Sequence, residues 1–234
     1  MSSLPRLTVA QADALADRFL EHCRAAGVLE AGAPAVSWPE FHAFRARLTA
    51  SFEVPTTTLT PLAARVLYGL AAARRPLTVA TLGCFAGNLM AWVSGPGFGP
   101  DSRYPGRRSL GLDVAAEPVA LAAANLRRAG FTPGAEAVVG DAFDAAAHSA
   151  DDTWDLLLID IDVPGARKSG YARLLERWLP RLAPEALVIA HDVCHPVFAW
   201  DLRDYAAFVK DRGALATTTL PVDDCGLEVS RWPG

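Results

Sequence analysis

From residue 77 onward, short apolar segments alternate with segments of helical periodicity, and this alternation limits the fold more than any other feature. Strands buried on both faces read as near-continuous apolar runs, and the helices between them make crossovers between parallel strands. The pattern predicts strands at 77–82, 109–114, 135–139, 155–160 and 187–190, and helices at 88–93, 116–129, 171–182 and 197–211. Two more strands, near 214–220 and 226–231, have no helix between them and should form an antiparallel hairpin at one edge. The predicted fold is therefore α/β, with a doubly wound, mostly parallel, seven-stranded sheet.

The first part of the chain is predicted to be helical and separate from this sheet. Apolar residues recur at helical spacing over 9–26, and further helices are expected over 39–50 and 61–73. We therefore divide the chain into an N-terminal helical cap, residues 1–60, and an α/β domain, residues 61–234. The cap is expected to cover the active site. The candidates for the wall of the active site are Trp38, Phe41, Phe52 and the threonines of 56–60. Packing in the core explains the three aromatic residues equally well.

The segment 95–108 is rich in Gly and Pro and is long for a crossover connection. Loops of this kind in compact domains are often functional. A lid over the site and a flexible insertion are both open interpretations.

Charge and hydropathy argue against several classes of protein. The net charge is −4, and Lys and Arg are scattered apart from three Arg pairs, which disfavours a large nucleic-acid interface. No apolar run reaches the roughly 18 residues of a membrane span, and no signal peptide is recognisable. The four cysteines are widely spaced and fit reduced thiols. We expect a cytoplasmic protein that acts on a small molecule, with no membrane or nucleic-acid partner.

Residues suited to a nucleoside follow the first three predicted strands. Ligands of open α/β sheets bind beyond the carboxyl ends of the strands, so these positions should meet. Gly83 and Gly87 follow the first strand and allow the backbone to approach a ligand closely. Asp113 ends the second strand, where a carboxylate suits the two hydroxyls of a ribose, although it could also cap the next helix. Asp141 and Phe143 follow the third strand and suit an adenine amino group and ring, or a capped turn.

From about Thr56 to its C-terminus, the chain resembles the catechol and caffeoyl-CoA O-methyltransferases of the class I methyltransferases. The segments that carry the resemblance are ATLGCFAGN (80–88), LGLD (110–113), VVGDAFD (138–144), WDLLLID (154–160), LAPEALVIAHDV (182–193) and GLEVS (226–230). The resemblance implies a Rossmann-like sheet, S-adenosylmethionine as cofactor, and a homodimer as one option. It implies cofactor contacts at Thr81, Gly83, Phe85, Gly87, Asn88, Asp113, Asp141, Ala142, Phe143 and Asp160. Thr81 and Asn88 depart from the Glu and Tyr that the family often has, which changes how the amino group of the cofactor is held.

The same family usually holds Mg²⁺ with two acids and an amide. Asp160 matches the first acid, and the usual Asp-Asn pair falls on His191 and Asp192. Magnesium prefers oxygen ligands, whereas an imidazole suits softer ions, so the resemblance leaves a Mg or Mn site at Asp160, His191 and Asp192 open. Asp162 is a spare acid two residues further on. The alternative is that these acids cap strands and helices.

Catalytic roles also follow from the resemblance. Lys168 stands three residues before Tyr171, as the family's catalytic lysine stands before a tyrosine, although four extra residues separate it from Asp160. Lys168 would then act as general base, or else be a solvated lysine at the start of a helix. Glu228 matches an acid that contacts a substrate hydroxyl in the catechol enzymes.

Three functions are consistent with the sequence. The first is methyl transfer to an oxygen of a small hydroxylated molecule, with metal assistance as an option. The second is an enzyme that consumes S-adenosylmethionine itself, closing an azetidine ring or cleaving the cofactor and releasing methylthioadenosine. The third is a non-catalytic module that only binds the cofactor. The products formed from S-adenosylmethionine distinguish these functions.

Overall fold

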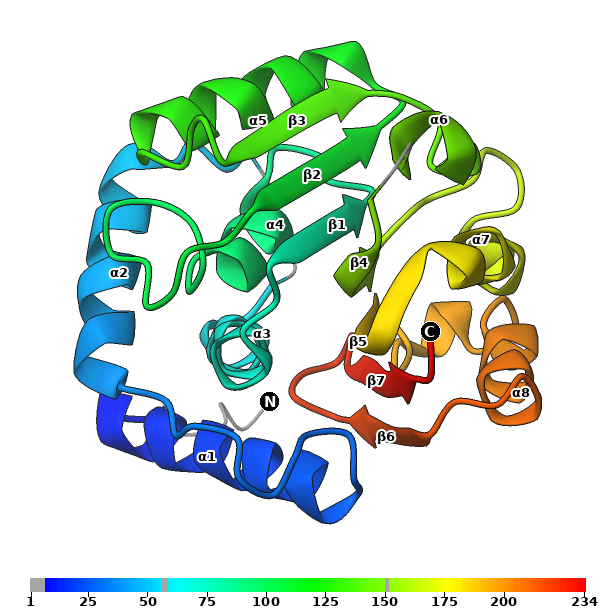
Figure 1. The fold of residues 1–234 in the computed structure, drawn as a ribbon, viewed down its shortest axis with the longest axis horizontal. Helices are drawn as coiled ribbons and strands as arrows, with labels where there is room; N and C mark the ends of the chain where they lie inside the picture. Colours follow the sequence, from blue (N-terminus) through cyan, green and yellow to red (C-terminus); the bar gives the residue numbers. More distant parts are fainter. Residues whose placement is uncertain (1–6, 56–58, 150–151) are drawn as a thin grey trace, which may run out of the picture.

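A computed structural model describes residues 7–55, 59–149 and 152–234. Its centre is a seven-stranded sheet of order β3-β2-β1-β4-β5-β7-β6 (Figure 1). β1 to β5 are mutually parallel where they pair, and β7 runs antiparallel between β5 and β6. The doubly wound α/β sheet and its antiparallel edge hairpin are therefore confirmed. The strands are β1 Thr78–Leu82, β2 Arg108–Asp113, β3 Ala135–Val139, β4 Trp154–Ile159, β5 Leu182–His191, β6 Ala216–Leu220 and β7 Leu227–Trp232.

Helices cover both faces of the sheet and bury one apolar core on each side. Strand side chains alternate between the cores: Leu187 and Ile189 of β5 face one, and Val188 and Ala190 face the other. The first core is completed by α1 Val9–Ala25, α2 Trp38–Ser51, α3 Pro61–Arg74, α4 Asn88–Ser94 and α5 Ala116–Arg128. The second is completed by α6 Ala145–Ser149, α7 Tyr171–Trp178 and α8 Arg203–Asp211.

The predicted element boundaries were least accurate around β5 and α8. The helix predicted over 171–182 ends at Trp178, because Pro180 cannot continue an α-helix, and a short 3-10 turn, Leu179–Arg181, follows. β5 begins at Leu182, which pairs with Trp154 of β4. The helix predicted over 197–211 is divided into a 3-10 turn, Pro196–Phe198, and α8. The short helix α6 was not predicted.

The N-terminal helices pack against α3 rather than over the strand ends. Phe41 of α2 is fully buried against Tyr68 of α3 and Trp92 of α4. Trp38 packs edge-on against Phe41. Within the described part of residues 1–60, Leu59 is the residue that lines the cavity described below, so the cap helices do not form its wall. Thr60 caps α3, and residues 56–58 lie outside the described residues.

A buried ion pair joins the first three helices. Nε of Arg65 on α3, which is 2% exposed, lies 2.6 Å from Oδ1 of Asp13 on α1, and Nε2 of His42 on α2 lies 2.8 Å from Oδ2 of the same carboxylate. The guanidinium also lies 5.2 Å from the centre of the Phe41 ring. Burial acts to raise the pKa of Asp13, but the hydrogen bonds from Arg65 and His42 outweigh it and hold the pKa below 3.8.

The loop over 95–107 is neither a lid nor a loose insertion. Arg107 donates its backbone N–H to Leu77 O, just before β1, and Phe98 is buried beside Gly134, just before β3. Gly106 and Gly97 lie against the rings of Phe98 and Tyr104, where a Cβ would clash. These contacts place the loop at the amino ends of the strands, on the side opposite the cavity.

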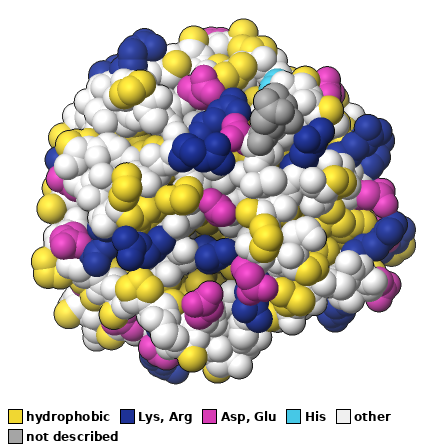
Figure 2. Space-filling model, viewed as in Figure 1, with side chains coloured by type: hydrophobic (Ala, Val, Ile, Leu, Met, Phe, Trp, Pro, Cys, Tyr) yellow, Lys and Arg dark blue, Asp and Glu magenta, His cyan; other side chains and the backbone are white. Residues whose placement is uncertain are grey.

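Several of the paired arginines of the sequence have polar partners in the fold. Arg107 and Arg108 both bind Asp152, and Arg74 donates to the backbone of Glu185. On the face drawn in Figure 2, basic and acidic side chains lie beside one another. No helix in the described part of the chain is both long and apolar enough to span a bilayer.

We predict that Arg65→Ala lowers the free energy of unfolding by about 3 kcal/mol, because it leaves the largely buried Asp13 carboxylate without its main partner. Urea denaturation at neutral pH measures this. Arg18→Ala, on the exposed face of α1, is the matched control and should stay within about 0.5 kcal/mol of wild type. Equal effects of the two substitutions would contradict the role given to the ion pair.

Candidate functional site

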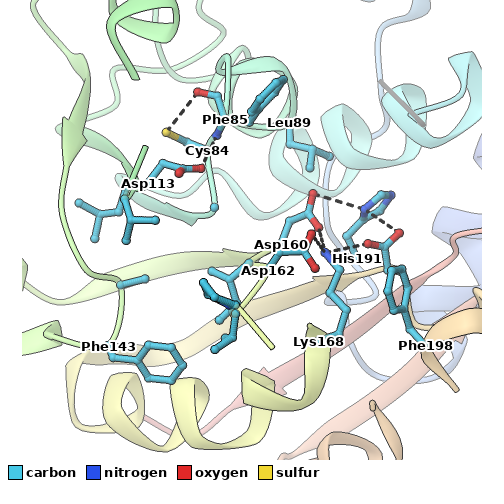
Figure 3. A pocket seen from close by; sticks show the side chains of 18 of the residues that line it. Cys84, Phe85, Leu89, Asp113, Phe143, Asp160, Asp162, Lys168, His191 and Phe198 are labelled. Carbon is cyan, nitrogen blue, oxygen red and sulfur yellow. Dashed lines mark hydrogen bonds and ion pairs between the residues drawn. The ribbon is translucent and has the colours of Figure 1, made fainter. Parts of the chain in front are cut away.

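A cavity of about 950 Å³ opens at the carboxyl ends of the five parallel strands. The segments after β1, β2, β3, β4 and β5 all contribute to its wall, as expected for a sheet of this topology. Figure 3 shows Phe85 and Asp113 on one side, and Asp160, Lys168 and His191 gathered on the other. The volume lies in the range of pockets that enclose a cofactor together with a small substrate.

The turn after β1 requires glycine at Gly83. Its φ is +86°, and an added Cβ would lie 2.1 Å from the carbonyl oxygen of Asp160. The N–H groups of Gly83 and Cys84 both donate to Leu112 O, at 2.8 and 2.9 Å. The turn is therefore fixed against both neighbouring strands, and its backbone lines the cavity.

Two acids project into the same side of the cavity from β2 and the loop after β3. Asp113 accepts hydrogen bonds from the N–H groups of Phe85 and Ala115, each at 3.0 Å, so it joins the glycine turn to the start of α5. Asp141 accepts from the N–H of Phe143 at 2.9 Å. The guanidinium of Arg173 lies 4.5 Å from the centre of the Phe143 ring and holds that ring at the wall.

The other end of the cavity holds a cluster of charged side chains. Lys168 is 2% exposed, and its Nζ lies 2.8 Å from Oδ1 of Asp160 and 2.9 Å from Oδ2 of Asp192. Asp162, which is largely exposed, is 3.5 Å from the same nitrogen. Nδ1 of His191 lies 3.5 Å from Asp160 Oδ2 and 3.4 Å from Asp192 Oδ1. We refer to Asp160, Lys168, His191 and Asp192 as the charged cluster.

Electrostatics hold Lys168 as a cation. Burial acts to lower the pKa of Lys168, but Asp160 and Asp192 outweigh it and raise the pKa above its usual value. Burial likewise acts to raise the pKa of Asp160, while His191 and Lys168 bring it down to about 2. A general base must be neutral, so the structure does not support the predicted role of Lys168 as the base.

The predicted metal ligands do not surround one vacant point. Asp160 and Asp192 both face the ammonium group of Lys168, which lies between them where a cation would bind. A second set, His191, Asp192 and Cys225, brings its ligand atoms within 4.8 Å of one another. Nitrogen, oxygen and sulfur donors suit a softer ion such as zinc, whereas magnesium prefers oxygen. These residues therefore do not fit a Mg²⁺ site.

Residues 81–193 match the family described as methyltransferase domain. This segment contains the glycine turn, both cavity acids and the charged cluster. This segment is a methyltransferase domain, so the methyltransferase resemblance seen in the sequence is confirmed over these residues.

Solved structures agree with the methyltransferase fold. A methyltransferase from Geobacter sulfurreducens is 25% identical, with a TM-score of 0.57 over 92% of this chain and 98% of that one. The O-methyltransferase TomG from Streptomyces achromogenes, involved in tomaymycin synthesis and solved with SAM, is 16% identical, with a TM-score of 0.64 over 98% and 100%. A protein described as a caffeoyl-CoA O-methyltransferase from Staphylococcus aureus is 17% identical, with a TM-score of 0.61 over 93% and 99%. Among curated proteins, no sequence matches this chain significantly.

The methyltransferase cavity includes most of the predicted cofactor contacts. Thr81 and Gly87 are exceptions: Thr81 is fully buried within β1, and Gly87 supports the turn from behind, against Ala122 of α5. Several residues of the wall could not be predicted, because they come from loops and helices without a recognisable motif. They include Leu59, Leu89, Val114, Arg173, His195, Phe198 and Cys225.

Glu228 lies outside the cavity of this methyltransferase, which corrects its predicted contact with substrate. Its side chain points from β7 toward α8, where it accepts hydrogen bonds from Tyr205 at 3.1 Å and from Thr217. Ser230 is its third partner, at 3.5 Å. Burial raises the pKa of Glu228 to about 7, although these hydrogen bonds act in the opposite direction.

We predict that Glu228 makes the stability of this methyltransferase depend on pH. Its folded pKa of about 7 exceeds the ordinary value of 4.5, so between these values the folded state binds a proton that the unfolded state lacks. The free energy of unfolding should therefore fall as pH rises from about 4.5 to 7, by as much as about 3 kcal/mol. Glu228→Gln should remove this fall.

Urea denaturation of wild type and Glu228→Gln at pH 5 and pH 7.5 measures the effect. Glu117→Gln, which removes an exposed carboxylate on α5, is the control. If the free energies of unfolding of wild type and Glu228→Gln differed by the same amount at both pH values, Glu228 would stay in one charge state and the prediction would be wrong.

Proposed function

We propose that this methyltransferase transfers the methyl group of S-adenosylmethionine to a hydroxyl oxygen of a small molecule. The observation that carries the proposal is the joining, in one cavity, of a glycine turn with two acids and a buried charged cluster. The first set suits a nucleoside with an amino acid tail. The second set suits a hydroxyl group that must be oriented and deprotonated.

On the cofactor side, each residue has a role that its position supports. Gly83 lets the backbone approach the methionine portion closely, and Asp113 offers carboxylate oxygens to the ribose hydroxyls. Asp141 and Phe143 are assigned to the adenine amino group and ring. Bound S-adenosylmethionine supplies a methyl group that is already activated by the sulfonium charge, so the protein mainly aligns the acceptor and removes its proton.

On the acceptor side, His191 is the residue proposed to take the proton. Its Nδ1 faces the carboxylates of Asp160 and Asp192, which favours placing the ring hydrogen on that nitrogen. Neither ring nitrogen makes a hydrogen bond with the described residues, and Nε2 is the atom proposed to accept the proton when Nδ1 carries the ring hydrogen. Lys168 supplies a fixed positive charge that would stabilise a forming oxyanion.

The acceptor wall favours a small molecule with an apolar body. Leu59, Val163, Pro164 and Phe198 line the cavity, and the centre of the Phe198 ring lies 5.5 Å from Nζ of Lys168. An apolar ring or chain can pack against these side chains while its hydroxyl group faces His191. The proposal includes a cytoplasmic setting, an acceptor other than nucleic acid, and a homodimer through the N-terminal helices.

Incubation with S-adenosylmethionine tests the reaction class. With a panel of phenols, catechols and aliphatic alcohols, we expect S-adenosylhomocysteine and a methylated acceptor in equal amounts, measured by mass spectrometry. When the protein is incubated with S-adenosylmethionine alone, the cofactor should break down no faster than in the no-enzyme control. Methylthioadenosine formed without an acceptor would contradict methyl transfer and favour the enzyme that consumes the cofactor itself. Tight binding without turnover across the panel would favour the non-catalytic alternative.

We predict that Asp113→Asn weakens S-adenosylmethionine binding about tenfold or more, because a charge-assisted hydrogen bond to the ribose is worth about 1.5–3 kcal/mol. Isothermal titration calorimetry measures the Kd. Asp144→Asn is the matched control, since Asp144 caps the turn at the start of α6 and does not line the cavity. Unchanged affinity in Asp113→Asn would remove this residue from the cofactor site.

A further inference from the structure

We propose that the ammonium group of Lys168 takes the place of a divalent cation, so that this site works without a bound metal ion. The inference rests on the proposed function, because it assigns the charge that would stabilise the acceptor oxygen there. It begins from the disagreement between the residues of the charged cluster and the requirements of a magnesium site.

The ammonium group of Lys168 lies between two carboxylates. Nζ of Lys168 bridges Oδ1 of Asp160 and Oδ2 of Asp192, at 2.8 and 2.9 Å. Both carboxylates come from the carboxyl ends of neighbouring parallel strands, β4 and β5, so their separation is fixed by the sheet. Lys168 arrives from the 3-10 turn Lys168–Gly170 that precedes α7, a third and independent element.

The positive charge of Lys168 is paired within the cluster. A buried ammonium is costly unless it is paired, and here two carboxylates pair it. The rings of Phe198 and Tyr171, whose centres lie 5.5 and 5.7 Å from Nζ, complete its surroundings. A divalent cation bound between the same oxygens would displace the ammonium and leave that charge without its partners in a largely buried place. Lys168 and a metal ion therefore exclude one another.

The donor atoms of the charged cluster do not suit magnesium. His191 stands where a hard cation would need an oxygen, and its Nδ1 is turned toward the two acids rather than toward an open ligand position. In this arrangement, an ammonium with three N–H donors suits the carboxylates better than magnesium would. The third donor, whose nearest carboxylate is the largely exposed Asp162 at 3.5 Å, is assigned to a substrate oxygen, which gives Lys168 the orienting role that a metal would otherwise have.

Metal titration tests the inference directly. After dialysis against EDTA, wild type should not bind Mn²⁺ in calorimetry or in Mn²⁺ EPR, with or without S-adenosylmethionine. Lys168→Ala should bind Mn²⁺ at least about tenfold more tightly than wild type, because it frees both carboxylates and the space between them. The double substitution Lys168→Ala with Asp192→Asn should lose this gain.

Lys210→Ala is the matched control, because Lys210 is the other lysine of the chain and is exposed on α8. It should behave as wild type. Stoichiometric binding of Mn²⁺ by wild type would overturn the inference, and this measurement requires no variant to fold. Failure of folded Lys168→Ala to gain Mn²⁺ affinity would overturn it as well. Neither readout needs turnover, so a failed acceptor screen would count against the proposed function and leave this test intact.

Discussion

The close approach of the turn after β1 to the end of β4 is the constraint on which the site depends. The N–H of Asp160 donates to Leu82 O at 2.8 Å, which continues the β1–β4 pairing one residue beyond the strands. Gly83 then leaves β1 at a place where a Cβ would meet the Asp160 carbonyl at 2.1 Å. Because that space is kept by glycine, the turn assigned to the cofactor and the first acid of the charged cluster share one wall. The two sides of the cavity therefore meet at this backbone contact.

The sheet, and the meeting of Gly83, Asp113 and Asp141 at one cavity, could be predicted from the sequence because their signals are local. Each strand is a short apolar run, and each of Gly83, Asp113 and Asp141 stands immediately after such a run. Parallel topology then brings the strand ends together whatever the details of packing. Departures arose where a choice depends on tertiary contacts. The loop over 95–107 has the composition of a mobile segment, yet Phe98 and Tyr104 anchor it at the far end of the sheet.

The roles of Glu228 and Lys168 could not be predicted, for different physical reasons. Glu228 has the expected motif position, but side chains of a strand alternate between faces, and this one faces α8 instead of the cavity. Lys168 does lie at the cavity, as the resemblance implied. Its charge state is set by Asp160 and Asp192, which come from two other segments, and no spacing along the chain encodes their distance from its nitrogen.

The charged cluster and the Glu228 group lie at the same side of the sheet but are balanced differently. In the cluster, the ammonium group of Lys168 lies between Asp160 and Asp192, and the pKa shifts of Lys168 and Asp160 hold these two groups in their charged forms. Glu228 has hydroxyl partners and no cation among its hydrogen-bond donors, so burial favours its neutral form near neutral pH. Opposite charges therefore keep the ions of the cluster charged at the cavity, where a preoriented charge can act on a substrate. Glu228, buried under α8, has no such partner among the described residues and titrates near neutral pH. This difference supports the charge-stabilising role proposed for Lys168 and a structural role for Glu228.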